Sequence, residues 1–283
     1  MLRVVYVLLC VGLITLSSPA QPEPSPLEKM IAAEHSFAKL ASEKGNRTAF
    51  LSYLTDDAIM FVPAKSNAKT YWTNRPESPV FIAWAPNFAD ISSNGLMGYT
   101  TGNAEYRLKG KDDQPTLWGH FVTVWLRQPN GGYKWVLDLG INHPKPEKYS
   151  TEWVTARESR QVPTKVPAAD AAHGFLMLVN EANAKKAYSS YAAESIRMYR
   201  EGQFPMLGKA KAVAQIGSEK GQMVLGEKST FFGAADLAYS TSTYSRIESG
   251  KAIEKGNFVQ IWKLIDGKWQ IVLDIFKALP EQK

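Results

Sequence analysis

The sequence predicts an α+β protein built from two tandem copies of one domain. Two observations support this: several motifs recur at an almost constant offset, and within each copy helical patterns come first and strand patterns follow. The chain has 283 residues, of which 45% are hydrophobic and 21% are charged. Such a composition supplies a sizeable core and excludes a disordered or collagen-like chain.

The repeat is clearest in two strand-like runs. GHFVTVW at 119–125 recurs as GNFVQIW at 256–262, and YKWVLD at 133–138 recurs as WQIVLD at 269–274. The offsets of 137 and 136 residues differ by one residue, which falls in the turn between the two runs. Four upstream positions repeat at an offset of 138, where His35, Phe37, Phe50 and Tyr53 match His173, Phe175, Tyr188 and Tyr191. An offset this constant indicates a duplication.

The expected elements of the first copy follow from hydrophobic periodicity. Apolar residues at helical spacing predict a helix that begins near Leu27 and stops at Gly45, and a short second helix through Phe50 and Leu54. A brief strand at 58–62 and an irregular proline-rich stretch come next. Three long strands are then expected at about 96–108, 117–127 and 133–141.

The second copy shows the same order of patterns. Helices are expected over 170–183, 184–192 and 206–217. The expected strands lie near 195–200, 222–232, 235–247, 256–265 and 268–276. We therefore predict a first domain at 21–144 and a second domain at 169–283, joined by a linker at 145–168 that is rich in proline and mixed charge.

The N-terminal residues 1–20 have the pattern of a cleavable signal peptide. A positive charge at Arg3 precedes an apolar run at 4–16, and the small residues Ser18 and Ala20 suit a signal peptidase. We expect cleavage near Ala20 and a periplasmic or secreted protein that has no membrane contact after signal removal. The alternative is a buried N-terminal helix, which the three prolines between positions 22 and 26 disfavour.

Cysteine usage and charge restrict the chemistry further. Cys10, the only cysteine, leaves with the signal peptide, so the mature chain has no disulfide and no thiolate ligand. We expect no cofactor and no metal, because the four histidines lack metal-ligand spacing. The net charge of +6 is spread evenly rather than clustered, which argues against nucleic acid as a partner.

The order of elements and several short motifs resemble one known family. Two helices, a short strand that follows LTDDA at 54–58, GYTTG at 98–102 and a glycine-turned hairpin within 119–140 are similar to the nuclear-transport-factor-2-like superfamily, and most of all to its SnoaL-like, ketosteroid-isomerase-like domains of unknown function. The resemblance implies two tandem cone-shaped domains, each a curved, mostly antiparallel sheet wrapped around N-terminal helices. It also implies a frequent apolar pocket and frequent pairing of domains through their sheet faces.

The resemblance does not carry an isomerase activity with it. In the ketosteroid-isomerase-like branch, a base carboxylate lies near the end of the strand after the Asp-Asp-Ala motif, just before a proline. In this chain Val62 holds that position, and Tyr199 stands at the equivalent distance in the second copy. Neither side chain can act as the base.

The turn at 266–267 predicts which side chains of the last two strands share a face. An Asp-Gly turn at 266–267 is typical of a two-residue hairpin, which pairs Trp262 with Ile271 and Val259 with Asp274. Alternation then places Gln260 and Trp262 on the core or pocket face. The candidate ligand-binding residues are Tyr53, Tyr99, Thr123, Trp125 and Trp135 in the first copy, and Tyr191, Tyr239, Gln260, Trp262 and Trp269 in the second. Ordinary core packing is the alternative for all ten.

The opposite face mixes Val and Ile with His120 and Asp138. This mixture suits a protein interface, so we expect the two copies to pair within the chain; a solvated face is the alternative. His120 with Asp138 on the neighbouring strand is the best candidate for a general base. Asn257 replaces the histidine in the second copy, which weakens that candidate.

These observations favour an exported, non-catalytic protein that binds a small apolar or carbohydrate-like ligand or serves as a scaffold. The main alternative is an isomerase or hydrolase of a small lipophilic compound, acting in the cone pocket through His120 or through a carboxylate that the sequence does not identify. A third interpretation is purely structural, with both pockets filled by their own side chains.

Overall fold

The structure, a computed structural model, describes residues 23–76, 78–149, 152–156 and 162–280. The expected signal peptide lies outside these residues. Within them, no helix combines the length and the apolar character needed to cross a membrane.

The described residues form two units, each with its own sheet. The elements of the first unit are α1 (Pro26–Lys44), α2 (Asn46–Tyr53), β1 (Leu54–Phe61), β2 (Lys65–Asn67), α3 (Ala68–Asn74), β3 (Phe81–Ile91), β4 (Met97–Arg107), β5 (Leu117–Arg127), β6 (Tyr133–His143) and β7 (Val154–Thr155). The elements of the second unit are α4 (Ala168–Asn180), α5 (Ala184–Tyr191), β8 (Ala192–Arg200), β9 (Met206–Leu207), α6 (Lys209–Ser218), β10 (Gln222–Leu225), β11 (Thr230–Ala234), β12 (Leu237–Glu248), β13 (Lys251–Ile265) and β14 (Lys268–Ala278).

The two sheets share one topology. The first sheet has the order β2-β1-β6-β5-β4-β3-β7, and the second, read in the same direction, has the order β9-β8-β14-β13-β12-β10, with β11 also paired to β12. Thus β1, β4, β5 and β6 correspond to β8, β12, β13 and β14. Apart from the parallel contacts of β1 with β6, β8 with β14 and β3 with β7, the paired strands are antiparallel. This agrees with the predicted fold class of two α+β cones.

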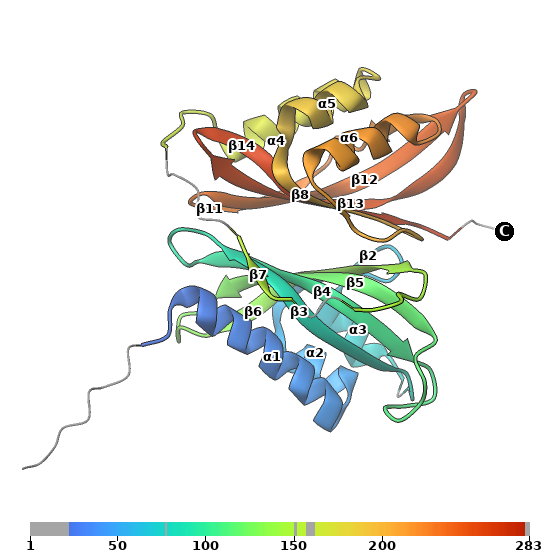
Figure 1. Cartoon of the computed structure of the whole chain (residues 1–283). Helices are drawn as coiled ribbons and strands as arrows, with labels where there is room; N and C mark the ends of the chain where they lie inside the picture. Colours follow the sequence, from blue (N-terminus) through green and yellow to red (C-terminus); the bar gives the residue numbers. More distant parts are fainter. Residues whose placement is uncertain (1–22, 77, 150–151, 157–161, 281–283) are drawn as a thin grey trace, which may run out of the picture.

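The molecule has four layers. The helices α1, α2 and α3 cover the outer face of the first sheet, α4, α5 and α6 cover the outer face of the second, and the two sheets face each other in the middle (Figure 1). The predicted linker contributes β7, which pairs with the edge strand β3 before the chain crosses to the second unit.

Helix α1 shows why the sequence folds as expected at the N-terminus of the first unit. Ser25 and Glu28 form a reciprocal capping box, and Pro26 occupies the first turn, where its missing N–H has no partner to lose. The helix ends at Gly45, whose φ of +84° favours glycine. Its buried face, which includes Phe37, packs on the sheet.

The stretch expected to be irregular and proline-rich is instead ordered. It contains α3 and the long strand β3, which the sequence analysis missed. Pro86 in β3 discourages a strand assignment, but β3 lies at the sheet edge beside only β4 and the two-residue β7, and its register shifts between Pro86 and Phe88. A proline is tolerated at such a bulge.

Each long hairpin has a β-bulge a few residues from its turn, and this bulge makes part of the predicted face assignment wrong. Trp262 pairs with Ile271 as expected, but Ile261 pairs with Leu273, so Val259 lies opposite Ile275 and not Asp274. The first unit has the same shift, between Val124 and Trp125. A bulge adds one residue to one strand, so every side chain beyond it changes face.

Apolar side chains fill the space between the two sheets. One buried cluster includes Val122 and Leu137 from the first sheet together with Val259 and Ile261 from the second. At the edge of this layer, the Nζ atom of Lys263 lies 3.1 Å from a carboxylate oxygen of Asp90 in the other unit. The sheet faces therefore contact each other rather than solvent.

Candidate functional site

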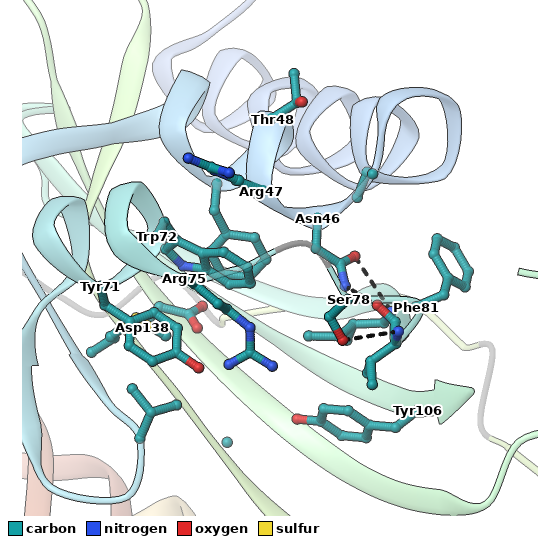
Figure 2. Close-up of a pocket in the computed structure, with 18 of the residues that line it drawn as sticks. Asn46, Arg47, Thr48, Tyr71, Trp72, Arg75, Ser78, Phe81, Tyr106 and Asp138 are labelled. Atoms are coloured by element: carbon teal, nitrogen blue, oxygen red, sulfur yellow. Dashed lines mark hydrogen bonds between the residues drawn. The ribbon is translucent and has the colours of Figure 1, made fainter. Parts of the chain in front are cut away.

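A cavity of about 910 Å³ opens in the first unit between its helices and its sheet. Its wall comes from the junction of α1 and α2, from α3 and the loop after it, and from parts of β1, β3, β4, β5 and β6, and Lys277 of the second unit also lines it. This volume lies within the roughly 300–1,000 Å³ of ordinary small-molecule sites. Figure 2 shows that aromatic, amide, carboxylate and guanidinium groups share the wall.

The rim of the cavity is held by Asn46 at the start of α2. The Nδ2 atom of Asn46 donates to the carbonyl of Val80 at 2.8 Å, and its Oδ1 atom accepts the N–H of Ile82 at 3.4 Å (Figure 2). Asn46 is the first residue of an Asn-Arg-Thr triplet, which has the pattern of a glycosylation acceptor. In the structure its side chain is hydrogen-bonded to the segment that precedes β3 and to the start of β3. The two bonds fix the segment that leads into β3 beside the helices.

One wall of the cavity is an aromatic stack on α3. The rings of Phe50 and Trp72 lie 4.4 Å apart in a stacked arrangement, and Tyr71 packs edge-on against Trp72. The guanidinium carbon of Arg75, just past the end of α3, lies 5.2 Å from the centre of the Tyr71 ring and 5.7 Å from that of Trp72. Figure 2 shows Arg75 reaching into the cavity between Tyr71 and Tyr106.

Two polar groups of this wall have few or no partners among the described residues. The indole Nε1–H of Trp72 is buried and has no hydrogen-bond partner there. Asp138 of β6 accepts a hydrogen bond from the Thr123 hydroxyl at 2.8 Å, and burial raises the pKa of its carboxyl to about 6. The bulge in β6 turns Asp138 toward the cavity, which corrects the prediction that it lies on the opposite face beside His120.

The equivalent aspartate of the second unit is fully partnered. Asp274 is buried, it accepts hydrogen bonds from Gln260 at 2.8 Å and from the Tyr188 hydroxyl at 3.0 Å, and it pairs with Nη1 of Arg200 at 2.8 Å. Arg200 also pairs with Glu219 at 3.0 Å. A cavity of only about 330 Å³ remains beside this ionic network.

The difference between the two aspartates comes from three substitutions between the copies. At the repeat offset of 138 residues, Phe50 stands where the second copy has Tyr188, and Val62 stands where it has Arg200. The equivalent strand pairings, Met60 with Asp138 and Met198 with Asp274, make Arg200 and not the predicted Tyr199 the counterpart of Val62. On β5, Thr123 stands where β13 has Gln260, since both pair with the aspartate of the next strand. Asp138 therefore lacks the cation and the tyrosine hydroxyl that hold Asp274, and it keeps one donor, Thr123, in place of Gln260.

A second buried carboxyl lies deeper in the first unit. Glu34 of α1 accepts hydrogen bonds from the Trp84 Nε1–H at 2.6 Å and from the Thr100 hydroxyl at 2.5 Å. Burial raises the pKa of Glu34 to about 7. Since Thr100 in turn accepts the Trp125 Nε1–H, Glu34 ties α1 to the sheet.

The ten predicted ligand-binding side chains lie outside the wall of the 910 Å³ cavity. Six of them belong to the helix-facing cores or pack against them: Tyr53, Trp125, Trp135, Tyr191, Trp262 and Trp269. Tyr99 and Tyr239 lie between the two sheets, because β4 and β12 turn these side chains away from the helices. Thr123 and Gln260 bind the two aspartates.

His120 is far from the arrangement expected of a general base. Its Nδ1 atom lies 3.0 Å from Nε2 of His143, and its ring lies near Tyr199 of the second unit. Burial lowers the pKa of His120 to about 3. It faces the layer between the sheets, whereas Asp138 faces the cavity.

The residues predicted from the sequence to bind a ligand include neither Arg75 nor Trp72. One signal for Asp138 was present: the run Trp-Val-Leu-Asp at 135–138 breaks strict alternation, as does Ile-Val-Leu-Asp at 271–274. Among the described residues, no group of three or more His, Cys, Asp or Glu side chains is placed to hold a metal ion.

Comparisons with known proteins give likeness at the level of structure. No family model and no curated protein matches the sequence. An NTF2-like protein of unknown function from Pseudomonas putida KT2440 is 15% identical, with a TM-score of 0.34, and the match covers 41% of this chain and 86% of that one. A putative ketosteroid isomerase from Parabacteroides distasonis is 17% identical, with a TM-score of 0.30, and covers 38% of this chain and 83% of that one.

A third solved structure, an NTF2-like protein with a cystatin-like fold from Novosphingobium aromaticivorans, is 16% identical with a TM-score of 0.33, covering 40% of this chain and 80% of that one. These matches concern about two fifths of the chain and carry no statement about its activity.

Proposed function

We propose that the first unit binds a small, partly apolar molecule in its cavity, and that the second unit is a scaffold that covers the first sheet. The observation that carries this proposal is the contrast between Asp138 and Asp274. In the second copy Asp274 is held by an ionic network. In the first copy the equivalent carboxyl, Asp138, lies beside a cavity of 910 Å³. Unfilled volume lined by aromatic and polar groups is typical of a ligand site.

The scaffold role is supported by the contacts between the units. The apolar cluster between the sheets draws on both copies, and Lys277 of the second unit donates to the carbonyl of Gly140 in the first at 2.7 Å. In this proposal the second copy takes the place of the other subunit of a dimer, and the export signal at 1–20 delivers the protein outside the cytoplasm.

The binding proposal is tested with the neutral fluorescent probe N-phenyl-1-naphthylamine. We expect one probe per chain. The double variant Val62→Arg with Phe50→Tyr copies two of the three partners of Asp274 into the first unit, so it should fill the space beside Asp138 and weaken binding. Leu207→Arg, at an exposed position of the second unit, is the matched control and should bind normally.

Equal probe binding by the double variant would show that the probe does not use this cavity, and no binding by the unmodified protein would count against a ligand site. Native mass spectrometry of the protein from its own host, followed by identification of any small molecule carried along, gives an independent measurement.

An isomerase or hydrolase remains the second candidate, and Asp138 is the observation that favours it. A carboxyl with a raised pKa beside a cavity can take and return a proton near neutral pH. Deuterium exchange next to the carbonyl of 2-tetralone, followed by NMR, tests for such a base. Exchange at the same rate with the unmodified protein and with Asp138→Asn would exclude Asp138 from that role.

A further inference from the structure

Positively charged side chains outnumber negatively charged ones around the cavity. Among the described wall residues, the positive side chains are Lys44, Arg47, Arg75, Lys111 and Lys277, and the negative one is Asp138. Most of the cations have protein partners: Arg47 donates to the carbonyl of Thr73, and Lys277 to that of Gly140. Arg75 contacts only the faces of Tyr71 and Trp72 in the described contacts, and its guanidinium extends into the cavity (Figure 2).

Tyr106 adds a second hydrogen-bonding group to this wall. Its hydroxyl stands across from Arg75 (Figure 2) and is protonated at neutral pH, and burial raises its pKa further, to about 12. The phenol can donate a hydrogen bond to an occupant that supplies an acceptor. The guanidinium and the phenol together therefore favour an occupant that carries negative charge.

We propose that the cavity takes a small organic acid, whose carboxylate binds the guanidinium of Arg75 and whose apolar body lies against the aromatic wall. This inference rests on the proposed binding function and adds the chemical class of the ligand. The planar guanidinium offers two parallel donors to a carboxylate. Phe50, Phe81 and Tyr106 supply the surface for the apolar body.

The test uses three probes with one carbon skeleton: 4-phenylbutanoate, 4-phenylbutan-1-ol and 4-phenylbutylamine, titrated calorimetrically into the protein at neutral pH. We expect the acid to bind about tenfold more tightly than the alcohol, and the amine most weakly. Arg75→Gln should reduce the affinity for the acid about tenfold while leaving the alcohol unchanged. Lys251→Gln, in an exposed hairpin of the second unit, is the control and should keep the preference.

Equal affinities for the three probes would overturn the acid preference and leave the binding function intact. Tightest binding of the amine would make Asp138 the counter-charge and refute the proposal. Absence of binding by all three would count against the binding function itself.

Discussion

Glu34 makes the free energy of unfolding depend on pH in a direction that can be worked out from its surroundings. The unfolded chain releases the Glu34 proton near the ordinary pKa of 4.5, whereas the folded protein keeps it up to about pH 7. Between these values the folded state binds more protons than the unfolded state, so the free energy of unfolding falls as the pH rises. The pKa difference predicts a loss of about 2.5 kcal/mol from this group between roughly pH 5 and pH 8.

Glu34→Gln should remove this pH dependence. The amide imitates the protonated carboxyl, because its oxygen still accepts from Trp84 and its NH₂ group donates to Thr100, which can accept a second hydrogen bond. The variant should therefore gain stability relative to the unmodified protein as the pH rises, by about 2.5 kcal/mol over roughly pH 5 to pH 8.

The measurement is urea unfolding followed by tryptophan fluorescence at several pH values. The matched control is Glu43→Gln, at an exposed position on the same helix, which should follow the unmodified protein. Parallel stability profiles for Glu34→Gln and the unmodified protein would refute the argument, because they would mean that Glu34 titrates alike in the folded and unfolded states.

Three further changes test other parts of the structure. Gly119→Ala places a methyl group 2.1 Å from a backbone carbonyl oxygen of β6, so it should lower stability by about 1–3 kcal/mol in thermal unfolding; an unchanged midpoint would contradict this. Lys263→Met removes the cation from Asp90 and Asp236, and leaving these carboxylates buried should lower the free energy of urea unfolding by about 3–5 kcal/mol, whereas a loss below about 1 kcal/mol would show that the ion pairs matter little. His120 keeps a pKa of about 3 when folded against 6.5 when unfolded, so it contributes stability that is lost as the pH falls from about 7 to 4; His120→Asn should flatten the profile by about 3 kcal/mol there, and an unchanged slope would disprove the assignment.

Much of the fold could be predicted because its signals are local or repeated. Helix α1 carries its cap, its apolar face and its terminating glycine in consecutive residues. The repeated motif begins with glycine in both copies, at Gly119 and Gly256. A Cβ at these positions would lie 2.1 Å and 2.2 Å from a backbone carbonyl oxygen, so only glycine fits. The duplicated pattern therefore records a close contact between strands that occurs in both copies.

The site was harder to predict because its geometry depends on a single extra residue. Strict alternation puts Asp138 beside His120, but the bulge at the end of the hairpin turns the two side chains to opposite faces of the sheet. The cavity wall also combines Asn46, Trp72 and Arg75 from segments that no periodic pattern connects. Hydrophobic periodicity reports which face of an element is buried, and it does not report where burial is incomplete.

Comparison of the two copies explains why incomplete burial is stable at Asp138. Loss of the partner of a buried charge usually costs about 3–5 kcal/mol, which would act against a first copy that has valine where the second has Arg200. The cost is smaller when the carboxyl can hold a proton or meet solvent, and Asp138 does both: its pKa is raised and its side chain lines an open cavity. The open cavity and the unpaired carboxyl thus depend on each other, since closing the cavity without adding a cation would leave the carboxylate buried without a counter-charge. In the second copy Arg200 removes that constraint, which is why its interior can close around Asp274.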